Sequence, residues 1–364
     1  MAEKATYKIK PEILEFMRKS AGLSQEDVAK KLKLQKSEYF SIENGEERVP
    51  QNILFDLADL YKRPLVAFYT IDTKQNIELP HDFRLNRDKK ISPQVYLAKR
   101  KALYLAGELK EITERKTELP DLDTNVPATV LADQVWRILD IDYAILKEVV
   151  ASKDETALGY YKSLIEEKFF IPIIEHPLKT NGVRAFSVFG EVSVMVLNES
   201  DQDEVKLFSL FHEFCHLLKR QDGICTVDIE NDEHNEPDER YCDEFTAILL
   251  MPEQEVRESI KEYPVTGKQL NDTAKAFGVS KLVTLIRFKE LGILNPGRYK
   301  RLKTELESVQ KKPGGRRNWE QTFIKRTSRL VLNNLIASYK KGDLTYTSLS
   351  TITGIKDKYL QKLI

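Results

Sequence analysis

The sequence has 364 residues, enough for two or three domains, with 41% apolar and 31% charged residues. Its 57 basic and 57 acidic residues cancel, which excludes an overall field that would draw the protein to nucleic acid or to a membrane surface. No apolar run approaches the roughly 18 residues of a membrane span, no apolar signal segment follows Met1, and three cysteines are too few for a disulfide scaffold. We therefore expect a cytoplasmic protein with no membrane partner.

Residues 8–70 carry the signals of a compact helical unit. Pro11 opens a first helix, and Ser24 begins a second with an acidic residue at its third position, as in a capping box. A third helix is predicted over Gln35–Glu43, and Pro50 opens a fourth helix that has one apolar face.

Two strings in this unit, GLSQEDVAKKL from Gly22 and SIENG from Ser41, resemble the Xre/Cro-type helix-turn-helix family. The resemblance implies a five-helix domain over residues 1–72, whose third helix enters the major groove of DNA. It implies DNA contacts by the following side chains: Gln25 toward phosphate, and Gln35, Lys36, Ser37 and Tyr39 toward bases. These 72 residues hold 12 basic and 12 acidic residues, which weakens attraction to phosphate. Dimerisation or capture of a protein partner therefore stands beside operator DNA as an alternative.

The middle of the chain predicts helices followed by a small sheet. Residues 73–127 have the pattern of a linker and a helical connector. Further helices are predicted at 128–150 and 159–168, and strands are predicted at 169–174, 182–187 and 192–198. We expect an α+β unit over residues 128–260 in a chain that is mostly helical.

The most informative motif is His212-Glu213-Phe214-Cys215-His216, which lies inside an apolar helical run. Residues four apart share one face of a helix, so His212 and His216 can bind one metal ion. Glu213 can reach a water bound to that ion. Such a short pattern also arises by chance in unrelated helices, but its place on an amphipathic helix favours a metal-dependent hydrolase.

Catalytic zinc usually takes a third protein ligand. His234 is one candidate, in a polar loop. Glu239 is the better candidate, because it follows Pro237, a residue typical of helix starts. Asp243 lies one turn further on the same face and would accept a hydrogen bond from a ligand histidine. The alternative is that this acidic segment is a solvated helix face.

HEFCH, followed by ERYCDEFTAILLMP from Glu239, resembles the ImmA/IrrE family of metallopeptidases. The resemblance implies a zincin-like catalytic domain in which His212, His216 and Glu239 bind the metal and Glu213 is the general base. Asp243 stands where the family usually has Asn, and Asp can still accept the hydrogen bond. Zn²⁺ is the expected metal, and the same ligands also suit Mn²⁺ or Fe²⁺.

Residues 261–364 are expected to form a helical C-terminal region. Within it, 269–294 has the pattern of a second helix-turn-helix, which need not mean DNA binding. Residues 298–329 hold 11 basic and three acidic residues. This excess is typical of a solvated linker, or of a contact with nucleic acid or an acidic substrate.

These features predict a zinc-dependent endopeptidase fused to a helix-turn-helix domain. The resemblance implies a regulatory protein substrate, in particular an Xre-type repressor of stress or mobile-element genes, and a homodimer is a further expectation. One alternative is a DNA-binding transcriptional regulator whose peptidase domain senses metal or ligand; Glu213 argues against it, because a structural zinc has no use for that residue. Another is an antitoxin or phage-defence component that acts by binding a partner protein. This alternative predicts that Glu213→Gln leaves the function unchanged.

Overall fold

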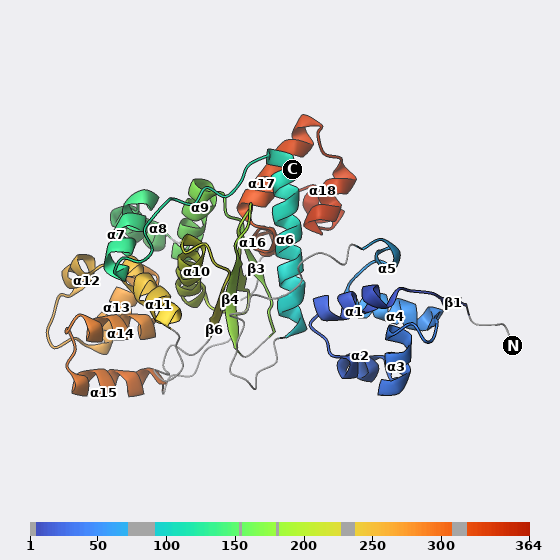
Figure 1. The fold of residues 1–364 in the computed structure, drawn as a ribbon. Helices are drawn as coiled ribbons and strands as arrows, with labels where there is room; N and C mark the ends of the chain where they lie inside the picture. Colours follow the sequence, from blue (N-terminus) through green and yellow to red (C-terminus); the bar gives the residue numbers. More distant parts are fainter. Residues whose placement is uncertain (1–4, 72–91, 153–154, 180–181, 227–236, 308–318) are drawn as a thin grey trace. The chain divides into compact units, whose positions relative to one another are not determined.

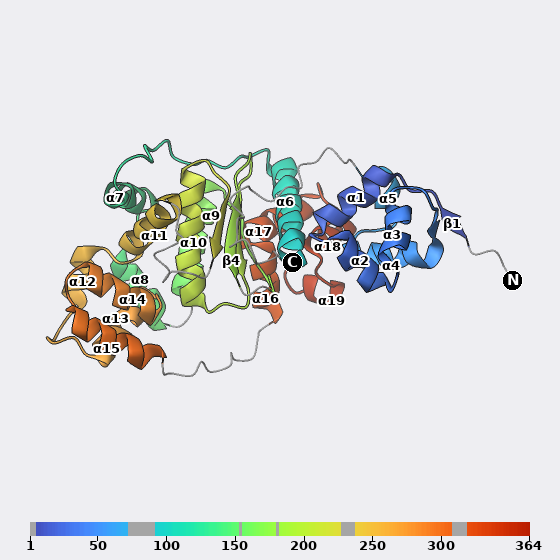
Figure 2. The ribbon, with the colours of Figure 1, turned by 60° about the horizontal axis from the view of Figure 1, so that its bottom comes forward.

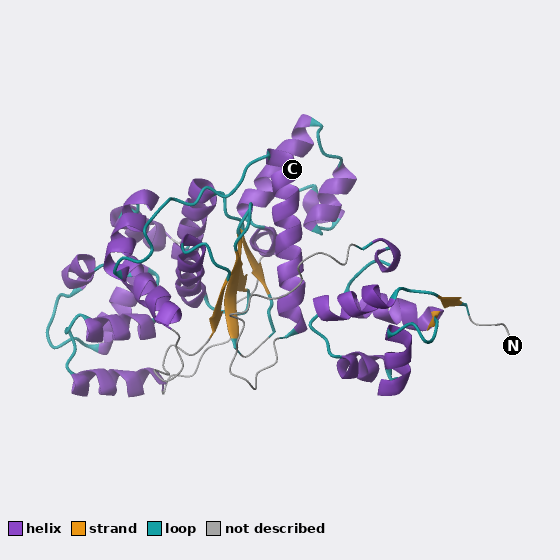
Figure 3. Ribbon diagram, viewed as in Figure 1, coloured by secondary structure: helices purple, strands orange, loops and turns teal. Residues whose placement is uncertain are grey.

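The computed structural model describes residues 5–71, 92–152, 155–179, 182–226, 237–307 and 319–364. The chain is mostly helical with small sheets, as the sequence predicts (Figure 1, Figure 3). It divides into two compact units, residues 1–100 and 101–364. In the ranges given above, no helix combines the length and the apolar character of a membrane span.

The first unit contains the helices that the sequence predicts near the N-terminus. Its elements are β1 (Thr6–Tyr7), α1 (Pro11–Ser20), α2 (Gln25–Leu32), α3 (Lys36–Glu43), β2 (Val49–Pro50), α4 (Gln51–Tyr61) and α5 (Ala67–Thr70). The predicted helix starts are confirmed: Pro11 is the first residue of α1, and Ser24 caps α2 in a capping box with Asp27. β1 and β2 pair antiparallel.

A buried polar cluster joins four helices of this unit. Glu43 of α3 accepts hydrogen bonds from Arg18 Nε at 2.7 Å, Gln25 Nε2 at 2.8 Å and Tyr39 Oη at 2.6 Å. The Tyr39 hydroxyl also lies 2.7 Å from that of Tyr61 on α4. Burial alone would raise the pKa of Glu43, but the hydrogen bonds from Arg18, Tyr39 and Gln25 lower it. The charged carboxylate therefore fixes α1, α2 and α3 in one arrangement.

The second unit is built on a four-stranded sheet whose order is β3-β5-β4-β6. The strands are β3 (Ile173–His176), β4 (Val183–Val188), β5 (Val194–Asn198) and β6 (Gly223–Thr226). β4 is antiparallel to both β5 and β6, whereas β3 is parallel to β5. The strand predicted at 169–174 begins later, because α9 continues to Phe169 and Phe170 takes a left-handed conformation. β6 was not predicted.

The second unit also contains the following helices. They are α6 (Pro93–Thr113, which begins in the first unit), α7 (Ala128–Leu139), α8 (Tyr143–Ser152), α9 (Ala157–Phe169), α10 (Asp203–Leu218), α11 (Pro237–Leu250), α12 (Glu253–Ser259), α13 (Gly267–Phe277), α14 (Lys281–Glu290), α15 (Pro296–Glu307), α16 (Trp319–Thr327), α17 (Arg329–Lys341), α18 (Tyr346–Thr353) and α19 (Asp357–Leu360). The helix predicted at 128–150 is split into α7 and α8, because Asp140 adopts a left-handed conformation.

α9 and α10 lie on one face of the sheet, and α16 lies on the other (Figure 2). α10 packs against β4, β5 and β6 and also against α9 and α11. Its side chains from Lys206 to Leu218 are consequently buried all round the helix rather than along one stripe. A helix enclosed in this way is a rigid platform for a site.

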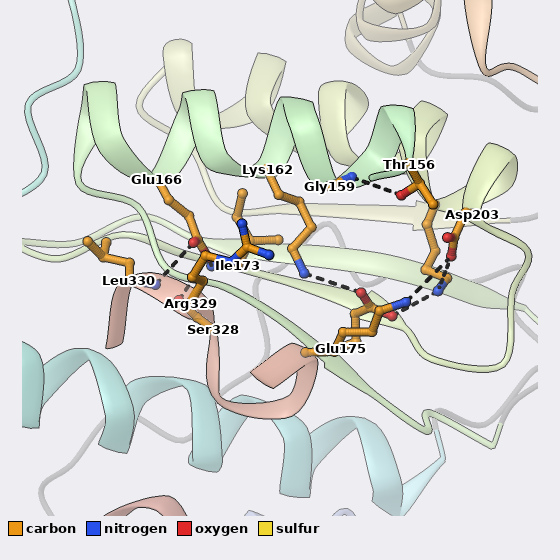
Figure 4. A network of polar contacts seen from close by, with 12 residues as sticks. Thr156, Gly159, Lys162, Glu166, Ile173, Glu175, Asp203, Ser328, Arg329 and Leu330 are labelled. Carbon is orange, nitrogen blue, oxygen red and sulfur yellow. Dashed lines mark hydrogen bonds and ion pairs between the residues drawn. The ribbon is translucent and has the colours of Figure 1, made fainter. Parts of the chain in front are cut away.

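An ion cluster links α10 to the edge of the sheet (Figure 4). Glu175 of β3 is only 1% exposed, and its carboxylate lies 2.8 Å from Lys206 Nζ of α10 and 3.2 Å from Lys162 Nζ of α9. Lys206 also reaches Asp203 at 2.9 Å. Burial alone would raise the pKa of Glu175, but Lys162 and Lys206 overcome this effect and lower it to about 2.

A second buried carboxylate fastens the C-terminal helices to the same unit (Figure 4). Glu166 of α9 accepts hydrogen bonds from the backbone N–H groups of Ile173 at 3.0 Å and Leu330 at 3.1 Å. It also accepts one from Ser328 Oγ at 2.8 Å, and Ser328 is the N-cap of α17. The helices after residue 318 are thus integral to the unit that contains the sheet.

Candidate metal centre

The candidate metal centre is formed by two neighbouring helices, α10 and α11. α10 begins with Asp203 and Glu204, which favour a helix N-terminus, and it presents the HEFCH motif in its last turns. α11 begins at Pro237, with Asp238 and Glu239 in its first turn. The two helices pack against each other, so side chains far apart in the sequence meet between them.

Three side chains converge there: His212, His216 and Glu239. The Nε2 atoms of the two histidines are 3.2 Å apart. Glu239 Oε2 lies 3.1 Å from His212 Nε2, and its Oε1 lies 3.3 Å from His216 Nε2. Zinc bonds of about 2.0–2.2 Å in tetrahedral geometry would separate ligand atoms by about 3.4 Å. The donor set and its spacing therefore fit a zinc ion with one coordination position left for water.

Asp243 occupies the next turn of α11 and contacts the outer side of His212. Its Oδ1 lies 2.9 Å from His212 Nδ1. A carboxylate at this position accepts a hydrogen bond from Nδ1–H, which keeps the proton on Nδ1 and leaves Nε2 free to bind a metal. Burial alone would lower the pKa of His216, but contacts with Cys242 and Glu239 raise it to about 10.

Glu213 is completely buried beside the three converging side chains. Its Oε2 accepts a hydrogen bond of 2.7 Å from Ser187 Oγ, whereas the buried Oε1 has no hydrogen-bond partner among the described residues. Burial raises the pKa of Glu213. A carboxyl group with a raised pKa and one uncommitted oxygen is suited to accept and return a proton.

The start of β6 lies directly against this centre. A Cβ atom at Gly223 would come within 2.5 Å of His216 Cδ2 and within 2.6 Å of Glu213 Oε2. Glycine is therefore required for the backbone to approach so closely. Sequence reasoning missed Gly223 and Ser187, because neither belongs to the HEFCH motif and both reach the centre only through strand pairing and the packing of α10 on the sheet.

The side chains expected to contact DNA do not share one environment. Gln35, Lys36 and Ser37 are exposed at the start of α3, where Lys36 forms an ion pair with Glu26. Gln25 is half-buried, and its amide is bound to the Glu43 carboxylate described above.

The base-facing role expected for Tyr39 is wrong, because its side chain is buried and its hydroxyl is bound inside the domain. Position 39 falls on the inner face of α3 together with Ile42 and Glu43. The other ligand candidate, His234, lies outside the described residues.

Family models match two parts of the chain. The helix-turn-helix model matches residues 14–68, and the model of the IrrE N-terminal-like domain, a peptidase family, matches residues 166–289. The second match contains α10, α11 and the sheet, and therefore all residues of the metal centre. No curated protein matches the chain.

Proposed function

We propose that this chain, which joins an N-terminal helix-turn-helix domain to an IrrE N-terminal-like metallopeptidase domain, is a zinc-dependent endopeptidase that cleaves a regulatory protein. The observation that carries the proposal is the convergence of His212, His216 and Glu239 beside the uncommitted Oε1 of Glu213. A structural zinc site is closed by four protein ligands and needs no neighbouring carboxylate.

The chemistry follows from the position of each side chain. His212, His216 and Glu239 would hold the ion, and Asp243 would keep His212 in the correct tautomer. Zn²⁺, when bound, supplies a Lewis acid for the peptide carbonyl and lowers the pKa of a water toward about 7. Glu213 takes the proton of the attacking water and returns it to the nitrogen of the leaving amine. Mn²⁺ or Fe²⁺ would suit the same ligands.

The sheet supports a peptide as the substrate. Within the part of the chain that the structure describes, β6 pairs on one side only, with β4. The first residue of β6, Gly223, lies against His216 and Glu213 of the metal centre. An extended peptide can add to such an edge through backbone hydrogen bonds. A peptide bound along this edge would run beside Gly223, and its scissile bond would lie next to Glu213.

The N-terminal domain supports the choice of substrate class. We propose that residues 1–72 bind a similar helix-turn-helix domain, so that the substrate is an Xre-type repressor and the enzyme acts in the cytoplasm. Operator binding is the second candidate, and the exposed Gln35, Lys36 and Ser37 at the start of α3 favour it. These exposed side chains would also suit a transcriptional regulator or an antitoxin that binds a partner protein.

Cleavage of candidate repressors by the zinc-loaded full chain tests the proposal. We expect a metal-dependent pair of fragments with the wild type and only a small residual rate with Glu213→Gln, which keeps the ligands. Deletion of residues 1–72 should raise KM for the repressor and leave cleavage of a short peptide from the cut site unchanged. A stoichiometric complex that forms equally well with Glu213→Gln, without any cleavage, would establish the binding role instead.

A further inference from the structure

Ser187 of β4 stands between Glu213 and the backbone of β6. Its Oγ donates a hydrogen bond of 2.7 Å to Glu213 Oε2 and accepts one of 3.1 Å from the N–H of Gly223. Ser187 and Gly223 are register partners in the β4–β6 ladder, so strand pairing itself brings the two groups together. The side chains of Ser187 and Glu213 are both completely buried.

The direction of these hydrogen bonds is fixed by their donors. A backbone N–H can only donate, so the Gly223 amide occupies a lone pair of the Ser187 oxygen. The single hydroxyl proton is therefore left for Glu213 Oε2. Water does not compete for it, because all three groups lie in the interior.

The two oxygens of Glu213 consequently differ. Oε2 is held by Ser187, whereas Oε1 is buried and has no partner in the described ranges of the chain. The proton transfer of the proposed reaction needs one free carboxylate oxygen at a defined place. Without a hydrogen bond to Oε2, the carboxylate would also populate intermediate rotations about its last bond, in which the free oxygen is displaced from that place.

We propose that Ser187 is a positioning residue, which locks the Glu213 carboxylate through Oε2 and reserves Oε1 for proton transfer. This inference rests on the proposed peptidase function. Gly223 completes the lock, because any side chain there would enter the space of Glu213 Oε2 and His216. The backbone N–H of residue 223 is thereby brought within hydrogen-bond distance of Ser187.

Ser187→Ala removes the hydroxyl, and Ser187→Thr keeps it. With a cleavable peptide, we expect Ser187→Ala to lower kcat by about 10- to 100-fold with little change in KM, because the base is misplaced while the substrate still binds. Ser187→Thr should recover most of kcat. In a Glu213→Gln background, Ser187→Ala should cause no further loss, since the group that it positions is already gone.

A measurement on the metal-free protein separates this inference from the proposed function. The infrared carboxyl band of Glu213 is identified as the difference between wild type and Glu213→Gln. We expect that band to shift in Ser187→Ala and to return in Ser187→Thr. The thermal midpoint, and zinc uptake when the metal is supplied again, serve as controls for folding.

The positioning role would be overturned by an unchanged Glu213 band in Ser187→Ala. An equal loss of kcat from Ser187→Ala in the wild-type and Glu213→Gln backgrounds would overturn it too, because that result marks a general structural effect. If Ser187→Ala does not fold, a Ser187→Thr variant that folds but lacks both the band and the activity would contradict the role. A wild type that cleaves nothing while the band behaves as expected would refute the peptidase and leave the Ser187–Glu213 link standing.

Discussion

Asp243 Oδ1 lies 2.9 Å from His212 Nδ1, so an aspartate on α11 contacts the ring nitrogen opposite the one that faces Glu239. This position is typically Asn in the family that the chain resembles. Both residue types offer an oxygen to the Nδ1 proton, but the carboxylate also makes the imidazole a stronger electron donor. The relationship leads to a prediction about metal affinity.

Asp243→Ala should weaken zinc binding by about 10- to 100-fold, because His212 loses the group that fixes its tautomer. Asp243→Asn should lose less, since the amide oxygen can still accept a hydrogen bond from Nδ1–H. Competition with a chromophoric chelator gives the dissociation constants. Glu244→Ala, an exposed neighbour on α11, is the matched control and should leave affinity unchanged. Equal affinity in Asp243→Ala and the control would contradict the role.

Gly223→Ala should damage the centre, because the added methyl carbon would lie 2.5 Å from His216 Cδ2 and 2.6 Å from Glu213 Oε2, well inside van der Waals contact. We expect zinc binding and cleavage to fall together, with a stability loss of about 1–3 kcal/mol from overpacking. Gly190→Ala is the control, since a Cβ there meets nothing closer than 3.8 Å. The measurements are elemental analysis and urea unfolding of both variants. Full zinc occupancy and activity in Gly223→Ala would refute the crowding argument.

Glu175 should make the second unit sensitive to acid. Its pKa is lowered from 4.5 to about 2 in the folded protein, so the carboxylate adds stability above pH 4.5, and this stability is lost as the pH falls toward 2. Glu175→Gln should flatten that part of the stability profile.

At pH 7, Glu175→Gln should also cost up to about 3–5 kcal/mol, because the buried Lys206 loses one of its two carboxylate partners and keeps only Asp203. Urea unfolding at pH 7 and pH 3.5 measures both effects. Exposed Glu204→Gln is the control. A variant whose stability changes with pH as steeply as that of the wild type would show that Glu175 is not the responsible group.

Tyr39→Phe should destabilise the first unit by about 1–2 kcal/mol, since the buried contacts of its hydroxyl with Glu43 and Tyr61 are lost. Ser37→Ala, on the exposed side of the same helix, should leave stability unchanged. Thermal unfolding compares the two. If Ser37→Ala were the more destabilising change, the assignment of inner and outer faces of α3 would be wrong.

Local signals in the sequence predicted much of the fold. Pro11 and Ser24 start their helices as expected, because capping and proline geometry act over a few residues. The strands predicted at 182–187 and 192–198 are β4 and β5, which pair antiparallel. Asp140 split a predicted helix because an αL residue ends a helix without any glycine or proline signal.

The candidate site shows which residues such local signals can predict and which they cannot. His212, Glu213 and His216 lie in one motif, so their common origin on a helix can be predicted from spacing alone. Ser187 is 26 residues from Glu213 and 36 from Gly223, and the three meet only through the pairing of β4 with β6 and the packing of α10 against both strands. The prediction for Tyr39 was wrong for a related reason. The resemblance implied an exposed, base-facing side chain, whereas packing against α4 buries it.

The most direct test of the central claim is the metal content of the purified full chain, measured side by side for wild type, Glu239→Ala and His234→Ala. We expect about one zinc per chain in the wild type and in His234→Ala, and loss of the metal in Glu239→Ala, because the centre is made by His212, His216 and Glu239. A wild-type protein that retains no metal after zinc is supplied and the excess removed would contradict a metal-dependent peptidase.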